Sequence, residues 1–425
     1  MQSKFCLSPV VICLALPIGL IAKIARTLCG THLRFLYQLP SPVSPVATTD
    51  ASPPAATTQT APDAEHEETS TPTWPVLRTA TLCLSFEAQG AVVLPSPATN
   101  AWRGPLGAYL RRLSSEAERK RGEGIYQELF RTPAIAVTLP EDLSGRTLGA
   151  LGLAGDHVPH PFVLRVPEAS PTRALRLAPG EQVAVEMVLV EDAIAHVPAL
   201  CAAFEAIAGE GIGARAAQPS GKKRKGHLRL CAGHLAVEGV QISLREDGCW
   251  SLPPVCDASL YDRASALGGS APPSPATPGE QEAKPVTVEL RTPLRLKHRG
   301  DYLAPGTLSA EGLAAGISRR VLGLAACYGP TPPGEAQVQA CRDAARALAE
   351  RTTLERGDDL RWAKRSRYSR RQSARHTASG LLGRFALRAA PADAARWRQL
   401  LRRAEALHLG KGSSLGQGHV ARSAA

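Results

Sequence analysis

The chain is predicted to be an α+β protein with two β-α-β-β-α-β units, preceded by an N-terminal extension that lacks a core. Three observations predict this fold. Strand and helix patterns occur twice in the same order, a Gly-, Pro- and Ser-rich linker separates them at residues 265–284, and residues 39–75 are rich in Pro, Thr, Ala and Ser. We therefore expect an extension at 1–75, a first domain at 76–264 and a second domain at 285–425.

The first domain shows the periodicities of both helices and strands. Apolar residues recur at helical spacing in Gly104–Lys120 and Ile194–Ala208. Strand patterns, alternating or continuously apolar, occupy Thr79–Phe86, Phe162–Val166, Gln182–Val190 and Leu235–Ser243. With the helices between them, these strands give the first β-α-β-β-α-β unit.

The second domain repeats this order. Strands are predicted at Val286–Arg291 and Leu382–Leu387, and helices at Leu313–Tyr328, Val338–Leu348 and Ala392–Ala406. The last helix leads into a glycine-rich segment.

The extension begins with an apolar stretch. Phe5–Ala22 is eighteen residues without a charge, the length of a short membrane span or a long signal-peptide core. The other interpretation is a start assigned too early, with the true one between Trp74 and Leu82, because methionine occurs only at positions 1 and 187. We expect a dispensable extension, disordered where it is Pro-rich, and a cytoplasmic protein; membrane anchoring is the alternative.

A basic segment interleaved with aromatic rings predicts nucleic-acid binding. The whole chain carries a formal charge of +12, which favours polyanions. Trp362 and Tyr368 lie in a stretch with no acidic residue and seven basic ones: Arg361, Lys364, Arg365, Arg367, Arg370, Arg371 and Arg375. Guanidinium groups pair with phosphate oxygens, and aromatic rings stack on unpaired bases. A solvated basic surface is the alternative.

A glycine-rich segment after the last helix predicts a phosphate-binding loop. Consecutive N–H groups in such a turn form a concavity for anions, to which Lys411 adds a charge. The spacing differs from that of a nucleotide-binding P-loop, and a plain glycine-rich helix stop is the alternative. The candidate RNA contacts here are His408, Gly410, Lys411, Gly412, Ser413, Gly416 and Gly418.

A second basic turn occupies Gly221–Gly226. As the tip of a hairpin it would contact the phosphates of an RNA stem, and as a solvated loop it would contact nothing. Its cations are Lys222, Lys223, Arg224 and Lys225.

No cofactor or metal is predicted. The ten cysteines are scattered without a C-x-x-C pair, as in a reduced cytosolic protein. The sequence has no Ser-His-Asp order, H-E-x-x-H helix or dinucleotide fingerprint. Carboxylate groups such as Asp358 and Asp359 are typical of turns, so no two-metal site is expected.

The basic and glycine-rich segments together resemble one protein family. Arg367–Gln372, Ser379–Gly383, Leu407–Gly412 and Leu415–Gly418 are similar to the C-terminal half of the CRISPR repeat-processing endoribonucleases of the RAMP superfamily. Earlier pieces follow in the family's order: Trp102–Gly107 with Tyr126–Phe130, Pro161–Leu164 with Gly209–Gly213, and Arg291–Lys297. The resemblance therefore extends from Val76 to Arg422.

This resemblance implies two ferredoxin-like domains in tandem and a defined activity. The activity is metal-independent cleavage of CRISPR precursor RNA within each repeat, by attack of a 2′-OH that leaves a 2′,3′-cyclic phosphate. The implied partners are repeat RNA, the crRNA product and other CRISPR effector subunits. The alternative is a RAMP subunit that binds crRNA in an effector complex without cutting it.

Cleavage without metal needs a base for the 2′-OH, an acid for the leaving oxygen and a cation for the phosphorane. The resemblance implies that these groups lie in the first domain. His157 and His160 are the candidate bases there, with Tyr109 or Tyr126 assisting; a purely decorative loop is the alternative. His376, inside the basic segment, is a second candidate base, and His408 is expected to be structural or to contact RNA.

Overall fold

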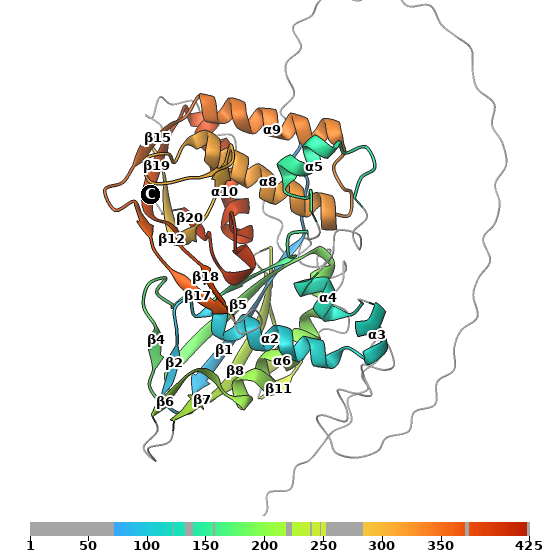
Figure 1. Ribbon diagram of the computed structural model, residues 1–425, viewed down its shortest axis with the longest axis vertical. Coiled ribbons are helices and arrows are strands. Elements are labelled where there is room, and N and C mark those ends of the chain that lie inside the picture. The colour runs from blue at the N-terminus through green and yellow to red at the C-terminus, as the bar shows by residue number, and fades with distance from the viewer. Residues whose placement is uncertain are drawn as a thin grey trace, which may run out of the picture. The chain divides into compact units, whose positions relative to one another are not determined.

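The computed structural model describes residues 72–121, 123–131, 139–155, 158–217, 223–238, 240–246, 248–251, 284–369 and 374–422. Two antiparallel sheets organise them (Figure 1). Residues 1–71 of the predicted extension and residues 265–283 of the predicted linker lie outside this part of the chain.

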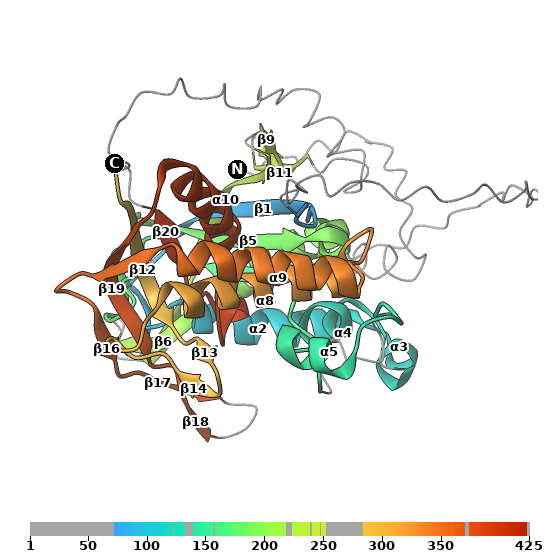
Figure 2. The ribbon, with the colours of Figure 1, turned by 90° about the horizontal axis from the view of Figure 1, so that it is seen from above.

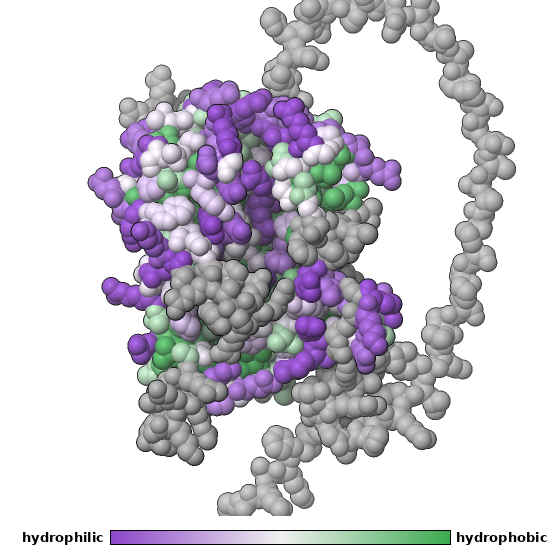
Figure 3. All heavy atoms as spheres, in the orientation of Figure 1, coloured by the Kyte–Doolittle hydropathy of each residue, from purple (hydrophilic) through white to green (hydrophobic). Residues whose placement is uncertain are grey.

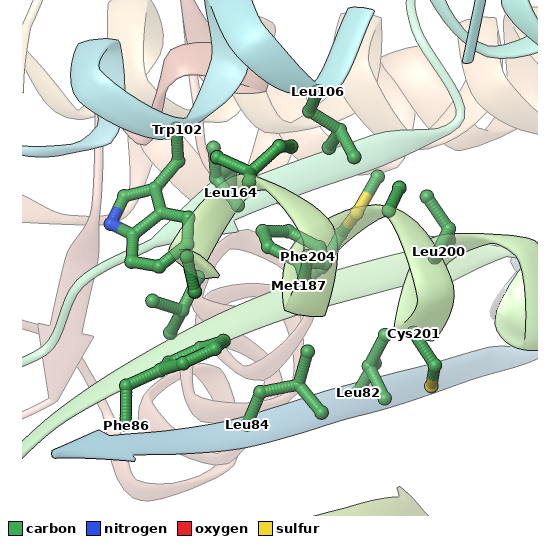
Figure 4. Packing of buried hydrophobic residues seen from close by; sticks show 14 of the residues in the cluster. Leu82, Leu84, Phe86, Trp102, Leu106, Leu164, Met187, Leu200, Cys201 and Phe204 are labelled. Carbon is green, nitrogen blue, oxygen red and sulfur yellow. The ribbon is translucent and has the colours of Figure 1, made fainter. Parts of the chain in front are cut away.

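The first sheet has the order β3-β5-β1-β8-β9. Its strands are β1 (Thr79–Ala88), β3 (Phe162–Arg165), β5 (Gln182–Val190), β8 (Leu228–Val237) and β9 (Val240–Ser243). Strict alternation in β1 buries every second residue, among them Leu82, Leu84 and Phe86. These side chains pack under Trp102 and Phe204, as Figure 4 shows.

Helices and small hairpins complete the first unit. Its helices are α2 (Thr99–Leu113), α3 (Glu116–Arg121), α4 (Ile125–Phe130), α5 (Gly145–Leu151), the 3-10 helix η2 (Glu191–His196) and α6 (Val197–Glu210). Its two-stranded ladders are β2 (Val92–Leu94) with β4 (Leu175–Leu177), β6 (Ile212–Ala217) with β7 (Lys223–Gly226), and β10 (Arg245–Glu246) with β11 (Cys249–Trp250).

The second sheet has the order β15-β19-β12-β20, with β16 also paired to β19. Its strands are β12 (Val286–Leu294), β15 (Thr353–Arg356), β16 (Arg361–Ala363), β19 (Gly380–Arg388) and β20 (Val420–Arg422). The helices are α8 (Ala310–Tyr328), α9 (Glu335–Glu350), α10 (Pro391–Leu407) and the 3-10 helix η3 (Ser413–Leu415). Two hairpins project from it: β13 (Lys297–His298) with β14 (Asp301–Tyr302), and β17 (Ser366–Ser369) with β18 (Ala374–Thr377).

Both sheets place the four strands of their unit in the order second-third-first-fourth. The first unit does so with β3-β5-β1-β8 and the second with β15-β19-β12-β20. This is the split-βαβ arrangement of the ferredoxin-like fold. The predicted α+β architecture with two such units is therefore confirmed.

Two predicted elements, one strand and one helix, are interrupted in the structure. The strand expected at Leu235–Ser243 is two strands, because the chain turns at Glu238, which has a φ of 48°. The helix expected at Gly104–Lys120 breaks at Ser114, where the backbone becomes extended with a ψ of 136°. Alternation and helical spacing both continue across these breaks, so they do not reveal them.

The segment before β1 lies against the helices of the second unit. Gln337 of α9 donates its side-chain amide to the carbonyl of Thr73 (3.0 Å), and Arg403 of α10 donates to that of Pro75 (3.3 Å). The Arg403 guanidinium also lies 5.7 Å from the ring centre of Trp74. Residues 72–78 therefore join the start of the first sheet to α9 and α10.

One helical stretch, Glu191–Glu210, is long and apolar enough to cross a membrane by length and composition, considering only the residues that the structure describes. It comprises η2 and α6, and its apolar residues form part of the core beneath the first sheet. Its composition is therefore that of a core helix. Phe5–Ala22 lies outside the described residues.

Candidate RNA interface and catalytic cluster

The basic segment forms one strand and most of a hairpin. β16 pairs with β19 through Arg361↔Leu382 and Ala363↔Gly380, and β17 pairs with β18 through Arg367↔His376 and Tyr368↔Arg375. Arg361 and Lys364 are exposed, and Arg365 is half-buried. The structure gives only the backbone of Arg367, Tyr368, Arg375 and His376, and Arg370 and Arg371 lie outside its described residues.

Trp362 is not a free stacking ring, because it is half-buried and packs against the core of the second unit. The Arg365 backbone N–H is held by the Ser379 hydroxyl at 2.8 Å, which fixes the chain where β16 passes into β17. The exposed cations Arg361 and Lys364 therefore lie on a backbone that is fixed to the second sheet.

The glycine loop, residues 408–419, uses its N–H groups mostly on carbonyls of the protein. Leu409 donates to Gly418 (2.9 Å), Lys411 to Arg295 (2.9 Å) and Gly418 to Pro293 (3.1 Å). These bonds hold the loop against the end of β12. Of its side chains, that of Lys411 is exposed.

The loop also contacts the first unit. Thr99, at the start of α2, donates its hydroxyl to the carbonyl of Leu415 at 2.6 Å. Gly416 has a φ of 74°, and a Cβ at this position would meet the carbonyl oxygen of Leu164 in β3. Glycine is therefore required here by close approach to the protein's own backbone.

Burial corrects part of the predicted RNA contacts in the loop. His408, Ser413, Gly416 and Gly418 are buried and cannot touch a solvated strand without rearrangement. His408 is fully buried and its Nδ1 lies 3.2 Å from the carbonyl of Gln417, so the structural role is the one that fits. Gly410 and Gly412 are half-buried, and Lys411 remains available.

A stacked histidine pair lies beneath the loop. The rings of His408 and His419 are 4.6 Å apart and nearly parallel, at 7°. Burial, with the nearby charges of Arg165 and Arg291, lowers the pKa of His419 to about 4. Burial likewise lowers the pKa of His408 well below its ordinary value, aided by His419 and Arg165. Both rings are therefore neutral at physiological pH.

The basic segment and the glycine loop come together at Arg295. Lys411 donates its N–H to the carbonyl of Arg295, whose guanidinium donates to the carbonyl of Thr377 at 3.2 Å. The Gln417 side-chain amide reaches the carbonyl of Ala378 at 3.5 Å. The glycine loop and Arg295 therefore lie next to Thr377 and Ala378, the residues that follow the basic segment.

Sequence reasoning did not single out two cations at the entry to the β13–β14 hairpin, Arg295 just before it and Lys297 at its first position. The guanidinium of Arg295 lies 4.4 Å from the ring centre of Tyr302, and Lys297 Nζ lies 5.1 Å from it. Cations held against an aromatic ring are ordered without being neutralised. The alternating R-L-K of Arg295–Lys297 was a possible signal, since two cations two residues apart lie on one side of a strand.

In the first unit, His160 lies beside Arg103, which was not among the candidate site residues predicted from the sequence. Arg103 of α2 donates from Nη2 to Nε2 of His160 at 3.2 Å. The Arg103 guanidinium also lies 5.1 Å from the ring centre of Phe130, and His160 stacks on Phe162 at 5.6 Å. Because guanidinium can only donate, this bond requires a neutral imidazole with its lone pair on Nε2.

Tyr126 belongs to the same aromatic stack, whereas Tyr109 does not. Tyr126 stacks on Phe130 at 5.8 Å, and Phe130 contacts Phe162 at 5.0 Å. The ring of Tyr109 lies under Arg112, at 5.4 Å. His157 lies outside the described residues, and His196 pairs with Glu128 at 2.7 Å.

The described part of the predicted second basic turn is a strand and not a turn, because Lys223–Gly226 form β7, which pairs with β6. Lys222 lies outside the described residues, Lys223 and Arg224 are described by their backbone in β7, and Lys225 is half-buried. The hairpin lies over β2, where Gly226 approaches Val92. Its RNA contacts stay a prediction.

Two family models match the chain. Residues 77–230 match one described as an N-terminal domain, and residues 288–420 match that of the CRISPR-associated endoribonuclease Cas6. The second sheet, the basic segment and the glycine loop all lie within the second match. Residues 288–420 therefore carry a domain of the Cas6 endoribonuclease type, which acts in CRISPR RNA processing. The resemblance of the sequence to the CRISPR repeat-processing endoribonucleases is confirmed.

Solved structures of this type align with the chain at low identity. A Cas6 product complex has 16% identity and a TM-score of 0.42, covering 81% of this chain and 99% of that one. Thermus thermophilus Cas6 has 14% identity and a TM-score of 0.39, covering 82% and 99%. A partial Cas6-RT-Cas1–Cas2 complex has 10% identity and a TM-score of 0.42, covering 82% and 46%. None of the curated proteins matches the chain.

Proposed function

We propose that this protein binds CRISPR repeat RNA and cuts it without a metal ion, by attack of a 2′-OH on the adjacent phosphate. The observation that carries the proposal is the contact between Arg103 and a neutral His160. A neutral imidazole is a base ready for a proton, and a guanidinium is the cation that a phosphorane needs. Both rest on the rigid Phe130–Phe162 pair.

In the proposed reaction, the phosphate displaces His160 as the partner of Arg103. His160 Nε2, released from the guanidinium, takes the proton of the 2′-OH while the 2′-oxygen bonds to phosphorus. The P–O5′ bond breaks, and the leaving oxygen takes a proton from an acid, for which Tyr126 is the candidate because it belongs to the same aromatic stack as His160. The products are a 2′,3′-cyclic phosphate and a 5′-hydroxyl.

Strand β3 connects the Arg103–His160 contact to the glycine loop. His160 precedes β3 by two residues, and Gly416 contacts Leu164 within it. A strand rises about 3.3 Å per residue, so these points are about 13 Å apart, a span of roughly two extended nucleotides. Lys411, Arg295 and Lys297 would hold the RNA on the second unit while Arg103 and His160 act on the first.

Cleavage of repeat RNA in EDTA tests the proposal. His160→Ala should slow cutting by at least about a hundredfold, the usual loss of a general base, with an unchanged Kd. His227→Ala, an exposed histidine bonded to the carbonyl of Gly209, is the matched control and should cut normally. A 2′-deoxy nucleotide at the cut position should block cutting and leave binding intact.

Two results would overturn the enzyme proposal in different ways. RNA that binds tightly but stays intact at every pH from about 6 to 9 would make the protein a crRNA-binding subunit. Cutting that needs Mg²⁺ and survives the 2′-deoxy substitution would overturn the mechanism while keeping the nuclease. Equal losses of binding and rate in His160→Ala would make this histidine a ligand contact.

A further inference from the structure

A groove runs along the helices of the second unit, between α8, α9 and the β13–β14 hairpin. It consists of two adjoining cavities of about 420 Å³ and 290 Å³, which share Arg299, Glu311 and Arg346. The larger cavity reaches Arg356 and the start of α8, and the smaller one reaches Arg342 and α5. Figure 2 shows α9 lying along α8 beside this hairpin, and Figure 3 shows hydrophilic side chains over α9.

The carboxylates of the groove are already paired. Glu311 lies 2.8 Å from Arg299, and Asp343 lies 2.6 Å from Arg346. Arg346 also reaches Glu350 at 4.0 Å. These carboxylates therefore form ion pairs with Arg299 and Arg346, the two arginines shared by the cavities. None of these ion pairs involves the other arginines of the groove.

Arg319 and Arg342 have no carboxylate within 4.0 Å in the part of the chain that the structure describes. Arg319 is held in place by bonds to the carbonyls of Ala150 (3.1 Å) and Lys297 (3.3 Å). Its burial and the neighbouring charge of Arg342 both lower the pKa of Arg319. Glu335, two turns before Arg342 on α9, accepts hydrogen bonds from Thr147 and Ser144, and these bonds lower its pKa more than the charge of Arg342 does.

The start of α8 adds a second cationic end to the groove. Its first N–H groups begin after Ser309, and the helix is nineteen residues long. Arg356 donates to the carbonyls of Gly306 and Leu308, which fixes its guanidinium beside this helix end. Cations thus occupy both ends, and a chain of anions spaced along the groove fits them better than one isolated ion.

The β13–β14 hairpin joins the groove to the candidate RNA interface. Lys297 lies on Tyr302 with Arg295, while its carbonyl accepts from Arg319 in the groove. Phosphates that leave Arg295 and Lys297 along this hairpin would next meet Arg319 and Arg342.

We propose that this groove binds the backbone phosphates of the unpaired RNA that flanks the cut repeat segment. The inference rests on the proposed function, since it needs RNA at the interface. It assigns to α8 and α9 a contribution to affinity that depends on the length of the RNA.

The test compares two RNAs on the full chain. One contains only the segment around the cut, and the other adds about ten unpaired nucleotides on each side. With the unchanged protein, log Kd of the longer RNA should depend more steeply on log salt, by about 0.7 for each added phosphate contact. Arg342→Gln should remove about one such contact for the longer RNA and leave the shorter RNA's Kd and cutting rate as they were.

Arg398→Gln is the matched control, because Arg398 is exposed on α10 and lines neither cavity. If it acts like Arg342→Gln, or if Arg342→Gln weakens both RNAs equally, the groove is not the flank site. Stabilisation of the unchanged protein by millimolar phosphate or nucleoside monophosphate, lost in Arg342→Gln, with no effect of the flanks, would identify a free-phosphate site and overturn the proposal. Failure to bind even the short RNA would instead overturn the proposed function.

Discussion

Each unit has a segment between the helix that precedes its last strand and that strand, and the two segments make different contacts. In the first unit the β6–β7 hairpin lies between α6 and β8, and in the second unit the glycine loop lies between α10 and β20. The hairpin packs on β2 of its own unit, where Gly213 meets the carbonyl of Val93. The glycine loop reaches the other unit and packs on β3. The same place in one fold can therefore carry an appendage or a joint between units.

In the proposed function, the two units also divide the chemistry from the binding. The first unit carries the Arg103–His160 contact on its aromatic stack, whereas the second carries the exposed cations around Arg295. Since the loop holds β3 next to the second unit, it would set the distance between the proposed catalytic cluster and the proposed RNA-binding surface.

The largest expected effect comes from disrupting the contact between the glycine loop and β3, which we call the joint between the units. Gly416→Ala places a methyl group against the carbonyl of Leu164 at a φ of 74°, which an L-residue adopts only with strain. We expect a loss of about 2 kcal/mol or more in the free energy of unfolding, measured by thermal or urea unfolding. Gly209→Ala is the matched control on α6, where a Cβ meets open space and helix propensity improves. Equal stability of the two variants would contradict the joint.

The glycine loop also shows what its sequence could not reveal. Glycines that point N–H groups at a ligand and glycines that approach the protein's own carbonyls require the same left-handed backbone. Gly410, for example, has a φ of 71°, and a Cβ there would meet the carbonyl of Arg295. Only the contacts of the folded chain separate these two uses.

Long alternating strands were predictable, whereas contacts between distant segments were not. The strand Gln182–Val190 was predicted with its observed bounds, because its alternation passes into a continuously apolar and buried run that ends at Val190. The strand Thr353–Arg356 was missed, since it is short and largely exposed. Arg103 and His160 are 57 residues apart and meet only when α2 packs beside β3. No local pattern marks such a pair.

A smaller effect is expected from acid, acting on the histidine pair beneath the joint. The pKa of His419 is lowered to about 4 in the folded protein, against about 6.5 in the unfolded chain. The unfolded chain therefore binds more protons between these values, and stability should fall as pH drops from about 6.5 to 4.

The melting temperature as a function of pH measures this dependence. His419→Gln should flatten the fall between pH 6.5 and 4, because one of the two lowered groups is gone. His227→Gln, exposed in the first unit's segment, should keep the steepness of the unchanged protein. An identical acid profile for His419→Gln would show that the pair does not govern the joint's response to pH.

The smallest effect concerns one cation on the joint itself. Lys411 is exposed while its backbone N–H is fixed on Arg295, so its charge is available at a defined place. Lys411→Ala should weaken RNA binding several-fold, about equally for all sequences, and reduce the slope of log Kd against log salt by about one. Lys225→Ala, in the β6–β7 hairpin of the first unit, is the matching variant. An equal reduction in both would extend the binding surface to the hairpin and end the division between the units, and no reduction in Lys411→Ala would remove the loop from the RNA interface.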